Sequence, residues 1–102
     1  MGKSQRNKGR RGQTEAVNML KDRDWQVIQT TSGIMNEDVV ATDPGGCQWS
    51  VEVKNHKIID IYRFRRQAIE QANKRKLPWM LMLKIPGGWL IMRKNETPIV
   101  WK

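Results

Sequence analysis

Residues 49–54 read Trp-Ser-Val-Glu-Val-Lys, with apolar and polar side chains in alternation. A period of two predicts a β-strand whose successive side chains point to opposite faces of a sheet. Glu52 and Lys54 therefore project from the same face. A carboxylate and an ammonium group are thereby held side by side on rigid backbone.

A second carboxylate is expected close by. Fourteen residues before Glu52, Asp38 directly precedes the apolar run Val39-Val40-Ala41. The sequence Asp43-Pro44-Gly45-Gly46 predicts a turn that pairs the two strands as a hairpin, so that Asp38 could lie beside Glu52. Oxygen ligands suit hard cations such as Mg²⁺, and a neighbouring ammonium group can orient a water molecule or offset charge on a phosphate. The pattern therefore points to metal-dependent hydrolysis.

The rest of the chain adds two helices and further strands. The predicted elements are, in order, a helix over 12–23, strands over 25–30, from 38 and over 49–54, a helix over 60–76, and strands over 79–85 and 89–93. Pro86-Gly87-Gly88 is typical of a turn between the last two strands. This order predicts an α/β or α+β fold with a mixed central sheet flanked by helices.

Residues 1–11 differ in composition from the rest of the chain. They are mostly Gly, Lys, Arg, Asn and Ser without hydrophobic periodicity, and they contain five of the basic residues. Such a segment cannot bury apolar surface, so we expect a flexible basic arm. Residues 12–102 are expected to form a single domain, because a chain of 102 residues has no room for a second one.

The charge of the chain indicates its class of partner. It carries 19 Lys and Arg residues against 10 Asp and Glu, for a formal net charge of +9. Nucleic acid is the expected partner, since no apolar stretch is long enough to cross a membrane or resembles a signal peptide. A cytoplasmic location is therefore expected, in the host if the source is viral. With one Cys and one His, a Cys/His zinc cluster is excluded.

The combination of Glu15 on the first helix, Asp38 at the start of a strand and Glu52-Val53-Lys54 on the next resembles the PD-(D/E)XK nuclease superfamily. The likeness covers roughly residues 8–93 and is nearest to the small archaeal-type Holliday junction resolvases. It implies a restriction-endonuclease-like core and a homodimer that resolves four-way DNA junctions.

The resemblance also implies a set of site residues. Asp38, Glu52 and the backbone carbonyl of Val53 would bind one Mg²⁺ or Mn²⁺, with Glu15 completing the site directly or through water. Lys54 would hold the attacking water and stabilise negative charge on the phosphate. Glu15, Asp38, Glu52 and Lys54 are thus the expected catalytic residues.

Two departures from the family pattern concern this site. Asn36 and Glu37 precede Asp38 where many members have proline, so Glu37 is an alternative ligand; Asp38 is preferred because it directly precedes the strand. Ala16 follows Glu15 where resolvases often have arginine. Arg10 and Arg11 are candidates to supply that charge.

Several residues outside the metal site are expected to contact DNA. Ser32 lies in the loop before Asp38, where a plain polar turn is the alternative. The full set of candidates is Lys8, Arg10, Arg11, Ser32, Arg63, Arg65 and Arg66. For the arginines of the second helix, the alternative is an ordinary solvated face. Phe64 and the apolar surface of this helix are expected to supply part of the dimer interface.

Two other functions remain open at this level. A less selective nuclease that nicks or trims DNA, for example in phage replication or packaging, would use the same four catalytic residues. A non-catalytic, basic nucleic-acid-binding protein would need only the charge. It would leave the carboxylates and Lys54 without a chemical purpose.

Overall fold

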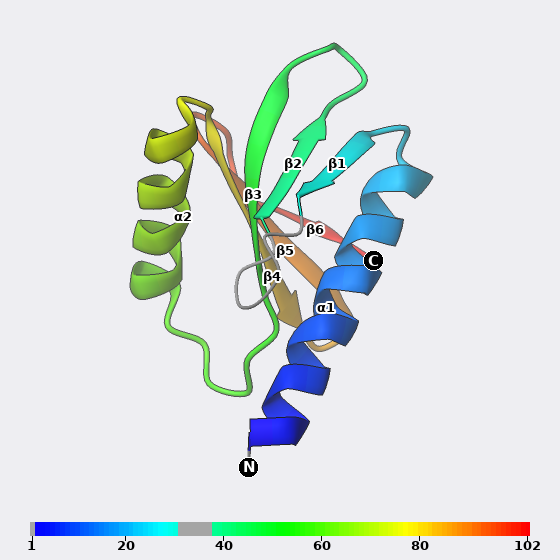
Figure 1. The fold of residues 1–102 in the computed structure, drawn as a ribbon, viewed down its shortest axis with the longest axis vertical. Coiled ribbons are helices and arrows are strands. Elements are labelled where there is room, and N and C mark those ends of the chain that lie inside the picture. The colour runs from blue at the N-terminus through cyan, green and yellow to red at the C-terminus, as the bar shows by residue number, and fades with distance from the viewer. Residues whose placement is uncertain (1, 31–37) are drawn as a thin grey trace.

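The computed structural model describes residues 2–30 and 38–102 (Figure 1). Within these residues, two helices and six strands follow one another. They are α1 (Gly2–Asp22), β1 (Gln26–Thr30), β2 (Asp38–Thr42), β3 (Gln48–Lys54), α2 (Ile61–Arg75), β4 (Trp79–Ile85), β5 (Gly88–Arg93) and β6 (Ile99–Trp101). The predicted α+β class and the element order up to β5 are therefore confirmed, and β6 is an additional strand.

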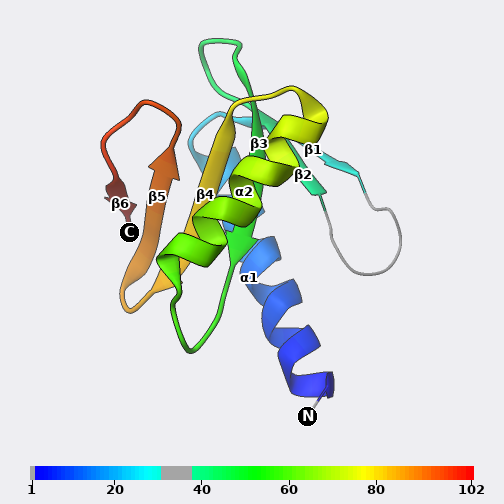
Figure 2. The same ribbon diagram turned by 90° about the vertical axis from the view of Figure 1, so that its left-hand side faces the viewer.

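The six strands form one mixed sheet in the order β1-β2-β3-β4-β5-β6. The pair β3 and β4 is parallel, and every other neighbouring pair is antiparallel. A parallel pair needs a crossover connection, and α2 supplies it (Figure 2). The predicted β2–β3 hairpin is confirmed, with Val39 opposite Val51.

The two helices cover opposite faces of this sheet (Figures 1 and 2). On one face, the α1 residues Ala16, Val17 and Leu20 pack against Met80 and Met82 of β4. On the other face, α2 packs through Phe64 and Ala68 against Leu81 and Leu83. Strand β4 is buried on both sides, as its continuous apolar sequence requires.

Helix α1 begins at Gly2, well before the predicted start at Gly12. The segment expected to be a basic arm is thus helical from Gly2 onward, and it projects beyond the end of the sheet (Figures 1 and 2). Lysine, arginine and glutamine have good helix propensities, and no proline interrupts residues 2–22. The buried turns of α1 therefore continue into this polar segment.

Arg75, near the end of α2, connects this helix to the β2–β3 hairpin through hydrogen bonds. Arg75 Nη1 donates to Ser50 Oγ at 2.8 Å and to the Val39 carbonyl oxygen at 3.5 Å. Ser50 is 2% exposed and is the buried polar residue of β3. One guanidinium group therefore joins α2, β2 and β3 at the end of β3 away from Lys54.

Replacing Arg75 with methionine is expected to lower the free energy of unfolding by about 1–3 kcal/mol, because Ser50 would remain buried after losing its donor. Urea denaturation measures this change. Lys74→Met, at the exposed position just before it, is the matched control and is expected to change stability by less than about 0.5 kcal/mol. Equal losses in both variants would contradict this role of Arg75.

Asp43 organises the turn between β2 and β3. Its carboxylate accepts hydrogen bonds from Trp49 Nε1 at 3.0 Å and from the Cys47 backbone N–H at 2.9 Å. These bonds, that of Trp49 first, hold the pKa of Asp43 below its ordinary value. A lowered folded-state pKa stabilises the fold above the unfolded pKa, near pH 4, and this stabilisation is lost as the pH falls through the folded value.

The variant Asp43→Ala is therefore expected to be about 1 kcal/mol less stable than the wild type at pH 6. The difference between the two proteins should shrink as the pH is lowered from 6, because Asp43 is protonated once the pH falls below its lowered folded-state pKa. Urea denaturation at a series of decreasing pH values measures the difference. A difference that does not depend on pH would show that the charge on Asp43 plays no part.

Candidate active site

The Glu52 carboxylate and the Lys54 ammonium group lie side by side on β3. Lys54 Nζ is 3.1 Å from Glu52 Oε2, and both side chains are partly buried, with exposed fractions of 18% and 26%. Val53, between them, packs with the α1 cluster. The strand alternation therefore places Glu52 and Lys54 on the same face of the sheet, as the sequence predicted, and this is the face that α2 covers.

Asp38 is the first residue of β2. Val39 pairs with Val51 across the hairpin, and one step further along each strand come Asp38 and Glu52. On the other side of β2, Asp38 is paired with Thr30 of β1. The backbone of β2 thus brings Asp38 to the end of β3 that carries Glu52. Its side chain lies outside what the structure describes, as do Ser32, Asn36 and Glu37.

The aromatic ring of Phe64 lies next to Lys54. Lys54 Nζ is 5.4 Å from the centroid of the Phe64 ring, within the range of a cation–π contact. Phe64 is 5% exposed and packs between α2 and the sheet, so it cannot form the predicted dimer interface. The prediction is therefore wrong for Phe64, because the helical spacing that placed it on an apolar face describes the face that α2 buries against β4. His56 stacks against the same ring with centroids 4.9 Å apart.

Glu15 belongs to a second Glu–Lys pair. Its Oε2 accepts hydrogen bonds from Lys84 Nζ at 2.7 Å and from Trp89 Nε1 at 2.8 Å. Trp89 is part of the cluster under α1. Glu15 therefore faces the β4–β5 hairpin on the α1 side of the sheet, whereas Glu52 and Lys54 lie on the α2 side.

Helix α1 nevertheless comes very close to the end of β3. A Cβ atom at Gly12 would lie 2.6 Å from the Asn55 Cβ, so this contact requires glycine. Asn55 directly follows Lys54 in the chain. The turn of α1 that carries Gly12 and Glu15 therefore borders the same end of the sheet as the Glu52–Lys54 pair.

The oxygen atoms at this end of β3 are of the kind that binds a hard divalent cation. Carboxylates and a backbone carbonyl are the oxygen ligands that Mg²⁺ and Mn²⁺ accept. Glu52 is partly exposed, and its Oε2 contacts Lys54 Nζ. Among the residues whose side chains are described, no group of three His, Cys, Asp or Glu residues could hold a metal ion. A site here would therefore depend on Asp38.

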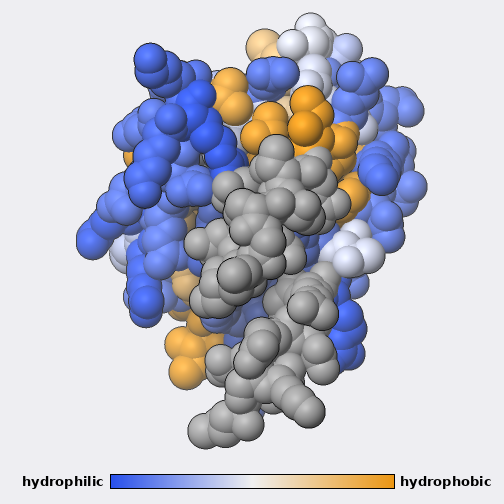
Figure 3. Space-filling view, in the orientation of Figure 1, coloured by the Kyte–Doolittle hydropathy of each residue, from blue (hydrophilic) through white to orange (hydrophobic). Residues whose placement is uncertain are grey.

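Three of the predicted DNA contacts lie on α2. Arg63, Arg65 and Arg66 are exposed, and the outer face of this helix is hydrophilic (Figure 3). Arg11 of α1 is also exposed. Lys8 and Arg10 lie in the N-terminal half of α1, and their side chains lie outside what the structure describes.

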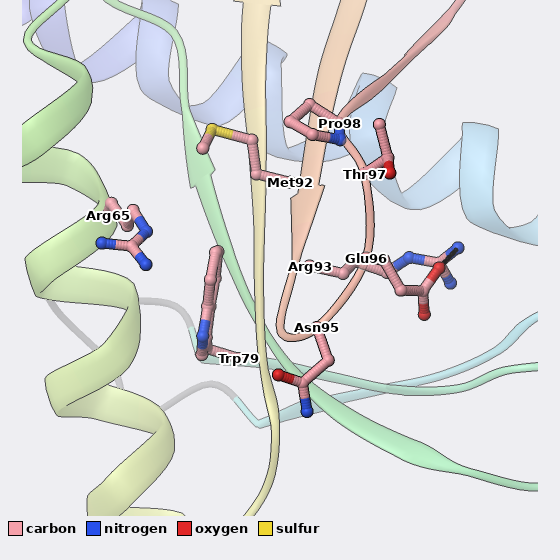
Figure 4. A pocket seen from close by; sticks show the side chains of 8 residues that line it. All are labelled: Arg65, Trp79, Met92, Arg93, Asn95, Glu96, Thr97 and Pro98. Atoms are coloured by element: carbon pink, nitrogen blue, oxygen red, sulfur yellow. Dashed lines mark ion pairs between the residues drawn. The ribbon is translucent and has the colours of Figure 1, made fainter.

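A groove of about 340 Å³ lies between α2, β4, β5 and the segment that leads to β6 (Figure 4). Its cations have partners within the groove: Arg65 lies 5.4 Å from the Trp79 ring, and Arg93 pairs with Glu96 at 2.6 Å. Trp79 pairs with Ser50, whereas Lys54 pairs with Leu83. The groove is therefore at the other end of β3 from the candidate site.

Comparison with known proteins identifies no relative. No family model matches the chain, and neither a curated protein nor a solved structure is significantly similar to it. Within residues 2–30 and 38–102, no helix has the length and apolar character needed to cross a membrane. The geometry at the end of β3 and the charge of the chain are therefore the features that indicate function.

Proposed function

We propose that this protein is a metal-dependent DNA endonuclease that hydrolyses phosphodiester bonds, with four-way junctions as its substrate. The observation that carries the proposal is the Glu52–Lys54 pair at the end of β3, with the backbone of Asp38 one register step beyond the Val39–Val51 pair. The fold would then be a restriction-endonuclease-like core, extended by β6 at one edge. The net charge of +9 supports a polyanionic substrate.

Asp38, Glu52 and the Val53 carbonyl would hold the Mg²⁺ or Mn²⁺ ion. When bound, the ion would polarise the phosphate and lower the pKa of a coordinated water molecule. Lys54 would donate to the attacking water and orient it toward phosphorus. Its positive charge would also stabilise the phosphate oxygens as negative charge accumulates on them.

Glu15 would have an indirect role in this mechanism. Its carboxylate is engaged by Lys84 and Trp89 on the α1 side, so it is not assigned as a direct ligand. A water molecule at the end of the sheet would have to bridge it to the ion. Its main effect would then be to fix α1 against the β4–β5 hairpin.

The basic surfaces would hold the DNA around this site. Exposed arginines on α2 and the basic turns at the start of α1 lie on elements that flank the sheet from both sides. Phosphate contacts from such residues give affinity and orientation but little sequence preference. Symmetric cutting of a junction requires two active sites, and a homodimer would supply them.

The substrate class is tested with labelled four-way junction, linear duplex and single-stranded DNA, each incubated with Mg²⁺. Paired, symmetric nicks in the junction alone are the expected result. Equal cutting of all three substrates would instead identify a less selective nicking or trimming nuclease that uses the same residues.

A further inference from the structure

The segment between β3 and α2 presents apolar side chains to solvent. Ile58 is 82% exposed and Tyr62 is 83% exposed, and Ile59 and Ile61 between them are each about 40% exposed. We call residues 58–62 the apolar tip. A hydrophobic area is visible at this end of α2 in Figure 3. Four large apolar residues within five positions are more than the scattered exposure of an ordinary surface.

The apolar tip is anchored to the candidate active site. Asp60 is the N-cap of α2, and its carboxylate accepts a hydrogen bond from the Arg63 N–H at 3.1 Å. Phe64, one turn further, lies beneath Lys54 and beside His56. The tip is therefore positioned relative to the Glu52–Lys54 pair through the Phe64 ring.

Charge around the apolar tip indicates what it would contact. Lys57, Arg63 and Arg66 are exposed beside it, and the one acidic residue within 57–66 is Asp60, which caps α2. A second copy of the chain would bring two such cationic surfaces together, which is unfavourable. Duplex DNA presents phosphates but keeps the faces of its bases stacked. Unstacked nucleotides present phosphates and bare base faces together.

We infer that the apolar tip inserts at a point where bases are unstacked, such as the centre of a four-way junction, and thereby selects branched DNA. Tyr62 would stack on an exposed base and Ile58 would occupy the gap between base pairs, while the neighbouring cations hold the flanking phosphates. This inference rests on the proposed function, because the tip would present the phosphate next to the branch point to Glu52 and Lys54.

A junction with 2-aminopurine at its branch point tests the inference, because the fluorescence of this base rises when it is unstacked. The Glu52→Gln protein serves as the uncut parent. Adding Ile58→Ser and Tyr62→Ala should abolish most of the fluorescence increase and weaken junction binding about 5- to 100-fold. Affinity for duplex DNA should stay within about twofold, because the phosphate contacts remain.

Two further variants control for general loss of apolar surface. Ile28→Ser removes an apolar side chain that is 49% exposed on β1, and it should leave both readouts unchanged. Tyr62→Phe should keep the stacking and therefore the signal. An unchanged fluorescence increase in the Ile58→Ser/Tyr62→Ala protein would overturn the inference. A dimer that dissociates on the same substitutions, measured by sedimentation, would overturn it in favour of a subunit interface.

The two proposals fail in different ways. If the wild type cleaves junctions but the parent produces no increase in fluorescence, the apolar tip has no such role and the nuclease remains. If the fluorescence increase depends on the tip but no substrate is cleaved, the tip recognises branched DNA and the nuclease proposal is wrong.

Discussion

Glu52→Gln is expected to lower the rate of DNA cleavage by at least about 10³-fold, since losing the proposed metal ligand would forfeit several kcal/mol of stabilisation of the transition state. Glutamine keeps the size of the side chain, so the fold and the basic surface should be unchanged. Junction binding should therefore remain within about threefold of the wild type. Single-turnover cleavage and a gel-shift titration measure the two effects.

The second Glu–Lys pair provides a matched control. Glu15 also contacts a lysine, at 2.7 Å, and its carboxylate is about half exposed. Glutamine at this position can still accept from Trp89, so Glu15→Gln should slow cleavage far less than Glu52→Gln, by less than about tenfold. Loss of activity to the same extent in both variants would place Glu15 in the metal site as a direct ligand.

Lys54→Met is expected to slow cleavage by about 10²- to 10³-fold, the effect of removing one preorganised donor to developing negative charge. Methionine retains much of the apolar stem over Phe64, so packing on this face is kept. The loss should appear in kcat with little change in KM, because the interaction is made mainly in the transition state. Steady-state kinetics on a fixed junction separate the two constants.

Lys84→Met is the corresponding control on the other pair. Lys84 lies 2.7 Å from Glu15 and 5.2 Å from the Trp89 ring, on the opposite face of the sheet from Lys54. Its replacement should leave cleavage within about threefold, because an exposed ion pair contributes about 1 kcal/mol or less. If Lys84→Met slowed cleavage more than Lys54→Met does, the lysine that takes part in catalysis would lie on the α1 side of the sheet.

The core of the fold could be predicted because its patterns are local. The alternation in 49–54 and the turn at 43–46 predicted the β2–β3 hairpin, and the helical spacing after Asp60 predicted α2. The three-residue strand β6 could not be predicted, because three residues after Pro98 are too few for a periodic signal. It depends on Gly88, where a Cβ would collide with the Trp101 carbonyl oxygen.

The candidate site was predictable only in part, for a similar reason. Glu52 and Lys54 are two positions apart on one strand, so their shared face follows from the period of the strand. The partners of Glu15 follow from no local pattern, because Lys84 and Trp89 lie 69 and 74 residues further along the chain. The contact of Arg75 with Ser50 across the parallel crossover likewise depends on tertiary packing.

The most direct test of the nuclease proposal is cleavage of a labelled four-way junction by the wild-type protein, first with Mg²⁺, then after EDTA, and again after excess Mg²⁺ is restored. We predict paired nicks with Mg²⁺, none in EDTA, and recovery of cleavage when the metal returns. Tight junction binding without metal-dependent cutting under any of these conditions would contradict the proposal and identify a basic nucleic-acid-binding protein.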